Sequence, residues 1–366
     1  MKSLYIHIPF CKKKCIYCDF YSEIYNFEKA SKFIEVICWQ IRKIREKNFE
    51  TIYIGGGTPS VLDLELLERL LKELYPLIKK AKEVSIEVNP ESIDEEKIEL
   101  LKDFVNRISI GVQSFNDKKL KALTRMHDAK KSIESILNLS KRFKNLSIDL
   151  IFGIWNEKIE DFKKDLETAT QFPLTHISVY NLTYEKNTPL YELKEKGKII
   201  PLDNEIEAKM YELCLKFLPK KKFYQYEISN FSKKGFECLH NLNYWNMGEF
   251  LGLGPGAASF LDKVYYRNYT PLESYIKRVK KNERFFFVEK KLTSKQKIKY
   301  KVILNFRRIR KIRISKEEQK VLKRALNYLI KEKYVKVKEN GNFKEFSLTK
   351  KGIFFYDELA KSILLC

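Results

Sequence analysis

Short apolar segments alternate with longer amphipathic segments through the first half of the chain. The apolar segments span residues 4–8, 51–54, 83–89, 107–112, 146–151 and 176–182. Between them, apolar side chains recur at helical spacing in residues 27–47, 94–104, 117–143 and 158–171, and in a segment that begins at Asp63. Six strand–helix units predict a parallel sheet, because parallel neighbours need a crossover helix. Eight units would close a barrel, so six predict an open α/β barrel.

The pattern becomes less regular after about residue 203. It predicts a helix over 204–218, strands over 223–228 and 264–269, and a turn-rich segment over 248–259, where glycines and a proline gather. Farther on, Ser315 can cap a helix, residues 333–339 and 343–348 read as a hairpin across Asn340-Gly341, and 352–365 read as a last helix. We therefore expect a barrel with an extension over 1–289 and a smaller winged-helix-like α+β domain over 290–366. No low-complexity linker separates them, so we expect them to pack together.

Composition narrows the class of protein. No apolar run approaches the ~18 residues that a membrane span needs, and the first residues lack the apolar core of a signal peptide. Four further cysteines are scattered along the chain, as is usual in a reducing cytosol: Cys38, Cys214, Cys238 and Cys366. These features predict a cytoplasmic protein, with peripheral attachment to a membrane as the alternative.

The chain carries a net charge of +23, and its lysines are spread along the whole length. A solvated, lysine-rich surface explains most of this charge. One stretch is different, since Lys290 to Arg313 holds eleven Lys or Arg residues and no Asp or Glu. This stretch predicts contact with an acidic partner or an anionic surface. RNA is the rival partner, but no RNA-binding signature is recognisable.

Three cysteines, Cys11, Cys15 and Cys18, follow the first predicted strand with C-x3-C-x2-C spacing. A [4Fe–4S] cluster normally takes four thiolates, so three leave one iron open to a ligand that is not protein. The lysines at positions 12–14 favour thiolate over thiol. A structural zinc site, with His7 as the nearest fourth ligand, and a disulfide stay open as alternatives.

The cysteine spacing, followed by an aromatic residue, resembles the radical S-adenosylmethionine (SAM) superfamily. Four further segments look like the HemW haem chaperones, which are relatives of the oxygen-independent coproporphyrinogen III dehydrogenases: YIHIPFC at 5–11, IGGGTPS at 54–60, IGVQSF at 110–115 and HNLNYW at 240–245. The resemblance covers nearly the whole chain. It implies a three-quarter (βα)6 radical SAM barrel, a [4Fe–4S] cluster on the three cysteines, SAM on the open iron, and haem.

Two kinds of residue suggest a ligand pocket at the carboxyl ends of the strands. The glycines at 55–57 let the backbone approach a ligand closely, although an ordinary tight turn is the alternative. Glu87 and Asp149 are acidic residues inside apolar strands, where a buried carboxylate needs partners, although exposure at the sheet end is the alternative. The resemblance implies that a set of residues contacts or lines the SAM site: Tyr5, Phe20, Gly56, Gly57, Thr58, Glu87, Gln113, Arg125 and Asp149. No residue is singled out as catalytic.

The motif at 240–245 offers a haem ligand. Imidazole is a common ligand of haem iron, and Tyr244 and Trp245 can stack on a macrocycle. A hydrogen-bonded structural histidine is the alternative for His240. The resemblance implies that this motif accompanies haem binding, and it leaves Cys238 as a weaker candidate ligand.

The chain departs from the pattern of its apparent relatives at three places. The dehydrogenases carry a further cysteine where Phe20 stands, which argues against direct porphyrinogen decarboxylation. The glycine segment reads GLGPGAA at 252–258, without the usual cysteine and histidine, and GIWN at 153–156 replaces the usual Gly-Leu-Pro-Gly. A haem ligand from the glycine segment is therefore in doubt.

The leading hypothesis is a haem chaperone that binds a [4Fe–4S] cluster, SAM and haem, and delivers haem to haem-requiring acceptor proteins. The resemblance suggests membrane-associated respiratory proteins as one class of acceptor. The first alternative is a radical SAM oxidoreductase of porphyrin biosynthesis. The second is a radical SAM enzyme that modifies RNA, which only the net charge favours.

Overall fold

The computed structural model describes residues 2–46, 48–340 and 343–365. Its main element is a 12-stranded sheet in the order β14-β13-β12-β11-β1-β4-β5-β6-β7-β8-β10-β9. The six predicted strands form its parallel centre: β1 (Ser3–Ile8), β4 (Thr51–Gly56), β5 (Glu83–Val88), β6 (Arg107–Gln113), β7 (Leu146–Phe152) and β8 (His176–Asn181). Among the described strands, the edge strands β14 and β9 do not pair with each other. The predicted open α/β barrel is therefore confirmed.

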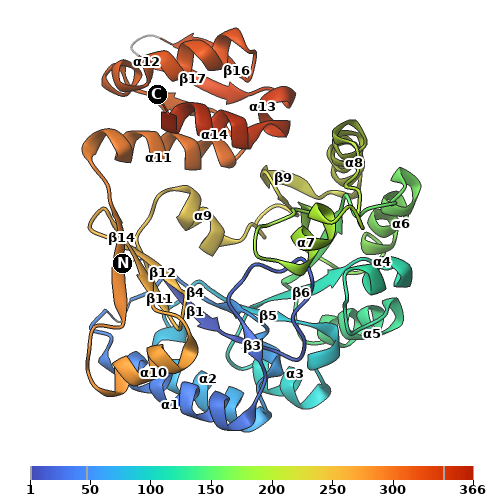
Figure 1. Cartoon of the computed structure of the whole chain (residues 1–366), viewed down its shortest axis with the longest axis vertical. Coiled ribbons are helices and arrows are strands. Elements are labelled where there is room, and N and C mark those ends of the chain that lie inside the picture. Colours follow the sequence, from blue (N-terminus) through green and yellow to red (C-terminus); the bar gives the residue numbers. More distant parts are fainter. Residues whose placement is uncertain (1, 47, 341–342, 366) are drawn as a thin grey trace.

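Helices cover the outer face of the parallel strands (Figure 1). They are α1 (Phe27–Lys43), α2 (Leu64–Ile78), α3 (Glu95–Leu101), α4 (Asp117–Ala122), α5 (Ala129–Ser140) and α6 (Ile159–Ala169). Asn26, Asp94 and Asp128 cap α1, α3 and α5 through their side chains, as short polar residues at helix starts do. The stretch 117–143, expected to be helical throughout, is divided into α4 and α5.

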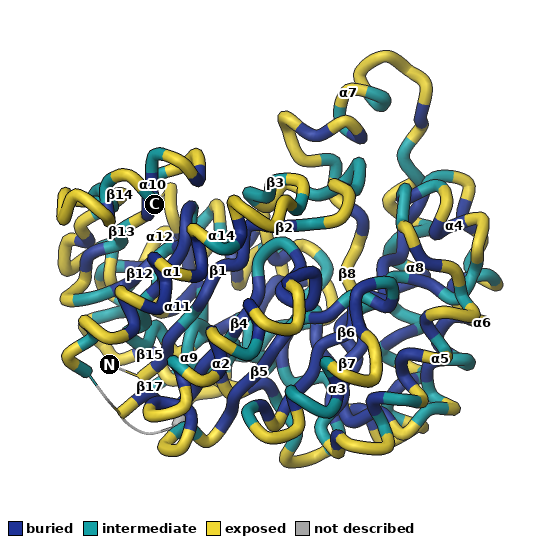
Figure 2. The backbone as a smooth tube through the Cα atoms, turned by 90° about the horizontal axis from the view of Figure 1, so that it is seen from below, coloured by how far each residue is buried: buried dark blue, intermediate teal, exposed yellow. Residues whose placement is uncertain are grey.

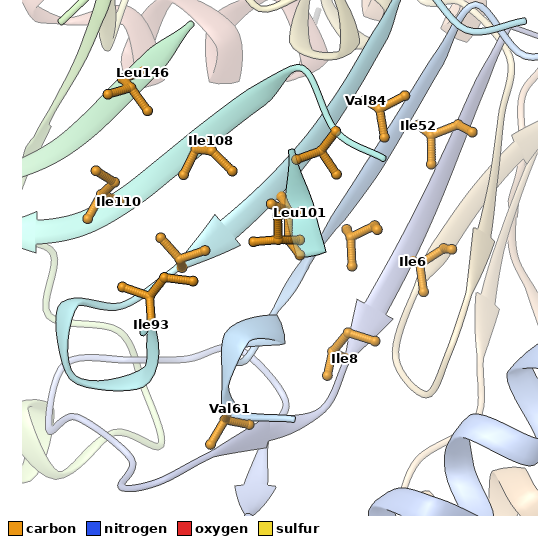
Figure 3. Close-up of a cluster of buried hydrophobic side chains, with 14 of the residues drawn as sticks. Ile6, Ile8, Ile52, Val61, Val84, Ile93, Leu101, Ile108, Ile110 and Leu146 are labelled. Carbon is orange, nitrogen blue, oxygen red and sulfur yellow. The ribbon is translucent and has the colours of Figure 1, made fainter. Parts of the chain in front are cut away.

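The side chains of the parallel strands alternate between two environments. Ile6 and Ile8 of β1, Ile52 of β4 and Val84 of β5 are buried in the layer between sheet and helices (Figure 3). Because successive strand residues point to opposite faces, the residues between them point to the barrel interior. Those residues are largely polar: Tyr5, His7, Tyr53, Glu83, Ser85, Glu87, Arg107, Ser109, Ser147 and Asp149. The sheet therefore has an apolar outer core and a polar interior.

Two extensions widen the sheet beyond the six parallel strands. After α7 (Pro189–Glu195) and α8 (Asn204–Phe217), β9 (Tyr224–Glu227) and β10 (Asn230–Ser232) join the β8 edge. On the other side, β11 (Phe250–Leu253) pairs with β1 in parallel. Antiparallel strands β12 (Ala258–Leu261), β13 (Val264–Asn268) and β14 (Phe286–Lys291) follow, with α10 (Leu272–Lys280) between the last two.

The turn-rich segment expected over 248–259 is present only over 254–256, because β11 precedes this turn and β12 follows it. Gly252 explains the error. Its backbone lies so close to the carbonyl of Ala258 that a Cβ atom at this position would overlap that oxygen. Glycine is thus required by the close approach of two strands, and it removed the apolar pattern by which strands are recognised.

The C-terminal residues form a compact module with its own buried core (Figure 1). It consists of α11 (Ser294–Arg307), β15 (Ile312–Ile314), α12 (Lys316–Lys331), β16 (Val335–Asn340), β17 (Phe343–Leu348), α13 (Lys350–Phe354) and α14 (Tyr356–Leu365). Strands β16 and β17 pair as the predicted hairpin, although Gly341 of the expected turn lies outside the described residues. The last predicted helix is divided at Phe355.

The C-terminal module packs on the barrel through α9 (Leu239–Trp245), which contacts α11. Figure 1 shows α9 between the module and the strands of the large sheet. Buried positions are concentrated in the central strands, whereas the outer helices mix buried and exposed positions (Figure 2). Within the described ranges, no helix is both long and apolar enough to cross a membrane.

Candidate functional site

One cavity of about 890 Å³ lies at the carboxyl ends of the parallel strands. We call it the central cavity. Its lining includes ten residues that the sequence predicted for the cluster or for SAM: Cys11, Cys15, Cys18, Gly56, Gly57, Thr58, Glu87, Gln113, Arg125 and Asp149. Phe20 also lines it and is 63% exposed. Residues from five strand ends thus meet in one place, which is where α/β barrels carry their function.

The cysteine loop is held at the rim of the cavity. Short strands β2 (Phe10–Cys11) and β3 (Glu23–Ile24) pair in parallel at its two ends. All three thiols are half-buried, and no disulfide joins them. Burial raises the pKa of Cys11, and it raises the pKa of Cys18 to about 11 although Lys14 opposes the shift. At Cys18, desolvation therefore outweighs the effect of Lys14, and a bound metal would favour the thiolate form there.

The glycines at 55–57, at the end of β4, lie directly against the cysteine loop. The amide of Gly57 donates to the carbonyl of Ile8 at 2.8 Å, and the amide of Thr58 donates to the carbonyl of Phe10 at 2.7 Å. A Cβ atom at Gly57 would lie 2.6 Å from the Phe10 oxygen, so this approach requires glycine. The Thr58 hydroxyl donates to the sulfur of Cys11 at 3.6 Å.

Two carboxylates face the cavity, Glu87 from β5 and Asp149 from β7, with β6 between them. Glu87 accepts hydrogen bonds from the Tyr53 hydroxyl at 2.9 Å and from the Gly56 amide at 3.0 Å. Burial raises the pKa of Glu87 to about 7, with nearby Asp149 adding to the shift. Burial also raises the pKa of Asp149, which accepts a hydrogen bond from Ser109 at 3.4 Å. These groups can accept hydrogen bonds from the hydroxyl and amino groups of a ligand.

Gln113 and Arg125 complete the polar wall. Gln113 ends β6 with a φ angle of 67°, a left-handed conformation that is uncommon outside glycine and marks sites of function. Arg125 donates to the sulfur of Cys15 at 3.5 Å and to the carbonyl of Gly111 at 2.9 Å. Its Nε atom is buried and has no partner among the described residues. Such a donor is suited to an anionic group of a ligand.

Tyr5 does not line the cavity. Its hydroxyl is 3.1 Å from Nδ1 of His7, and its ring lies 6.3 Å from that of Tyr53. His7 is also tied to the carbonyl of Tyr21 at 2.8 Å. Contact between Tyr5 and SAM therefore stays a prediction, since Tyr5 is not among the residues that line the cavity.

The 240–245 motif forms α9 rather than part of the cavity wall. His240 is 1% exposed, and both ring nitrogens have partners: Nδ1 lies 2.8 Å from the hydroxyl of Thr51 and Nε2 lies 2.7 Å from the hydroxyl of Tyr244. Burial, aided by Arg107, lowers the pKa of His240 to about 3. Neither nitrogen offers a free lone pair in this arrangement, so ligation of haem iron stays a prediction that requires the ring to leave a partner.

No pattern in the sequence points to the far part of the cavity. Its lining continues over β8, α8 and the β9–β10 turn to the C-terminal module, and it includes Tyr180, Asn181, Tyr211, Ile228, Ser229, Arg307 and residues 353–358. The module therefore closes one end of the cavity. Residues from such distant segments come together only in the tertiary fold, so no local sequence motif predicts them.

Arg307 and Arg308 of the basic stretch join the C-terminal module to the barrel, whereas Arg313 pairs within the module. Arg307 pairs with Glu227 at 3.4 Å, and its guanidinium group lies 4.6 Å from the centre of the Trp245 ring. Arg308 donates to Asn246, and Arg313 donates to Glu345 at 3.2 Å. An acidic partner of this stretch stays a prediction, for which exposed lysines such as Lys295 and Lys297 and the exposed Arg310 and Arg313 are available.

The fold and the cavity find matches among known proteins. A family model described as the Radical SAM superfamily matches residues 5–169. The solved structure of coproporphyrinogen III oxidase (HemN) from Escherichia coli covers 99% of this chain and 89% of its own, with a TM-score of 0.82 at 22% identity, which shows a shared fold. The open barrel with its three-cysteine loop is that of a radical SAM protein.

Two curated relatives narrow the family. The heme chaperone HemW of Lactococcus lactis is 35% identical over 87% of this chain and 84% of its own length. The heme chaperone HemW of Buchnera aphidicola subsp. Schizaphis graminum is 34% identical over 99% of this chain and 98% of its own. The chain belongs to the HemW family of radical SAM proteins.

The residues of the central cavity fit the [4Fe–4S] cluster and SAM that this class of protein uses. No three His, Cys, Asp or Glu side chains in the described part of the chain are grouped as ligands of a single metal ion. A four-iron cluster needs no such group, because each thiolate binds a different iron. The cavity beside the thiols is bordered by polar residues, among them Arg125, and by the side-chain-free backbone of Gly57.

Proposed function

We propose that this protein binds haem, a [4Fe–4S] cluster and SAM, and that it delivers haem to haem-requiring acceptor proteins. One observation carries the proposal: the identity to a protein named as a heme chaperone extends over 99% of this chain and 98% of that relative. The likeness thus includes the C-terminal module and α9 as well as the barrel. Phe20 stands where the coproporphyrinogen dehydrogenases carry an additional cysteine, which also favours a haem chaperone over a dehydrogenase.

The central cavity supplies the cofactor part of this proposal. Cys11, Cys15 and Cys18 would hold three irons and leave the fourth toward the cavity. When bound, the reduced cluster supplies an electron to SAM. Arg125 and Glu87 both line the cavity, so Arg125 would bind the carboxylate of SAM and Glu87 would accept hydrogen bonds from its polar groups.

Haem binding near His240 requires a local rearrangement of α9. The His240 ring is held by Thr51 and Tyr244, so iron ligation needs α9 to shift or one of these hydrogen bonds to break. Helix α9 is a suitable element for such a shift, because it is short and lies between the barrel and the C-terminal module. Trp245 adds an aromatic face on the same helix.

A radical SAM oxidoreductase of porphyrin biosynthesis is the second candidate. The fold shared with coproporphyrinogen III oxidase over 99% of the chain favours it. So does the central cavity, which extends from the cysteines to the C-terminal module and can hold a second ligand beside SAM.

Anaerobic incubation of reconstituted protein with coproporphyrinogen, SAM and a reductant tests the choice. The chaperone proposal expects no decarboxylated porphyrinogen, whereas haem added to the same protein shifts its Soret absorption. Decarboxylated product formed together with 5′-deoxyadenosine, without saturable haem binding, would replace the chaperone assignment by the oxidoreductase.

A further inference from the structure

A continuous chain of hydrogen bonds joins two of the three cysteine sulfurs. The Thr58 hydroxyl donates to the sulfur of Cys11 at 3.6 Å, and the Asn89 amide nitrogen donates to the Thr58 oxygen at 2.9 Å. On the other side, the Asn89 amide oxygen accepts from Nη2 of Arg125 at 2.8 Å. Nη1 of Arg125 donates to the sulfur of Cys15 at 3.5 Å. The single amide group of Asn89 thus connects the donors of both sulfurs.

The position of Asn89 indicates that its side chain serves the cavity. Asn89 precedes the short 3-10 helix Pro90–Ser92, at the position where an asparagine usually caps a helix through its side chain. It makes no side-chain cap hydrogen bond there. Its backbone is fixed instead, because its amide donates to Ser60 at 3.2 Å and its carbonyl accepts from the amide of Ser92 at 3.0 Å. A fixed backbone aims the amide group at Thr58 and Arg125.

Gly111 provides the space for this arrangement. A Cβ atom at Gly111 would lie 2.5 Å from the Asn89 amide oxygen and 3.4 Å from Nη2 of Arg125. The carbonyl of Gly111 also accepts a hydrogen bond from the same Nη2 atom at 2.9 Å. A side chain at position 111 would displace the Asn89 amide from Thr58 and Arg125 while leaving Asn89 in the sequence.

We infer that Asn89 is a positioning residue that sets the reduction potential of the cluster by holding the Thr58 and Arg125 donors on the sulfurs of Cys11 and Cys15. The inference rests on the proposed [4Fe–4S] site. Hydrogen bonds to the ligating sulfurs and a nearby positive charge stabilise the reduced, more negative cluster and raise its potential. Without Asn89, both donors lose the partner that orients them, and the cluster becomes harder to reduce.

The test is a redox titration of the reconstituted full chain, followed by the EPR signal of the reduced cluster in the absence of SAM. Asn89→Ala should lower the ratio of reduced to oxidised cluster at a fixed potential about tenfold, which is about 59 mV for a one-electron couple. Gly111→Ala should shift the potential in the same direction, because it displaces the Asn89 amide.

Asn106→Ala is the matched control. Asn106 accepts from the amide of Val84 at 2.8 Å and donates to the carbonyl of Lys82 at 3.0 Å, so it too joins neighbouring segments through both ends of its amide. It does so at the opposite end of β5 and away from the cavity lining. Its loss should affect stability but leave the potential unchanged.

Thr58→Val tests whether Asn89 acts by orienting the Thr58 and Arg125 donors or by a general disturbance of the cavity. If Asn89 acts through Thr58 and Arg125, the double variant with Asn89→Ala should shift the potential no further than Asn89→Ala alone. An additive double variant, or an unchanged potential in Asn89→Ala with full iron content, would overturn the inference. Wild-type protein without a cluster would overturn the proposed function itself, which iron analysis distinguishes.

Discussion

Replacing Arg307 by Met should loosen the C-terminal module, because Arg307 joins three segments at the boundary between the module and the barrel. Its Nε atom lies 3.4 Å from Glu227, which is fully buried. Its guanidinium group lies 4.6 Å from the Trp245 ring and 5.5 Å from the Tyr356 ring. Its carbonyl accepts from the amide of Ile228 at 3.1 Å, and this backbone bond is unaffected by the change.

The expected loss of stability follows from the buried Glu227 carboxylate, which stays in place without its partner. Removing one partner of a buried ion pair costs about 3–5 kcal/mol, and the lost cation–π contacts add ~0.5–1 kcal/mol. Because Arg307 is partly exposed, we expect the lower end, a loss of about 3 kcal/mol in the free energy of unfolding of the module. Urea unfolding at neutral pH measures this loss.

The pH dependence makes the prediction more specific. Burial raises the pKa of Glu227, and Arg307 opposes that shift, so the pKa rises further in Arg307→Met. A raised pKa means that ionisation of Glu227 destabilises the folded state and that protonation at lower pH removes this cost. The loss of unfolding free energy in Arg307→Met should therefore be smaller at pH 5 than at pH 8. The double variant Arg307→Met, Glu227→Gln should recover part of this loss. A loss below ~1 kcal/mol, or an equal loss at both pH values with no recovery, would refute the reasoning.

Three further predictions concern the central cavity. Reconstituted protein should carry about four iron and four sulfide per chain, and replacing Cys11, Cys15 and Cys18 together by Ala should abolish this; full iron retention would contradict it. Gln113→Ala should weaken the change that SAM causes in the EPR spectrum of the reduced cluster without loss of iron, and an unaltered response to SAM would oppose that role. Because burial raises the pKa of Glu87 to about 7, stability should fall by on the order of 3 kcal/mol as pH rises from ~4.5 to 7. In Glu87→Gln, the free energy of unfolding should change less over this pH range. If urea unfolding at several pH values shows the same pH dependence as in the wild type, another group titrates.

The six central strands were predictable because each has a clear apolar signature. Buried side chains at every second position, such as Ile6 and Ile8, alternate with polar ones, and helical segments of regular length separate the strands. The same alternation placed Glu87 and Asp149 on the inner face, where both line the cavity. The cysteine and glycine motifs, together with the positions of polar residues in the strands, thus predicted most of the residues that line this end of the cavity.

The remaining features depend on contacts between distant segments. β11 was missed because Gly252 is there for close strand approach and carries no apolar side chain. Asn89 is an ordinary turn residue in the sequence, and its role becomes visible only when Thr58 and Arg125 are brought beside it. The hydrogen bonds of His240 are likewise invisible in the sequence, since Thr51 lies 189 residues away.

Haem binding is the central claim, and an anaerobic equilibrium titration with haem tests it most directly. His176→Ala is the matched control for His240→Ala, because His176 is also a buried histidine with both ring nitrogens hydrogen bonded, to Ser147 at 2.7 Å and to Tyr226 at 2.8 Å. We predict saturable Soret absorption in the wild type and in the His176 variant, and an altered or weakened spectrum in the His240 variant. The protein with all three loop cysteines replaced should still bind haem, because His240 lies outside the cavity that is proposed to hold the cluster. A Soret signal that rises without saturation in the wild type, as for free haem, would contradict the account.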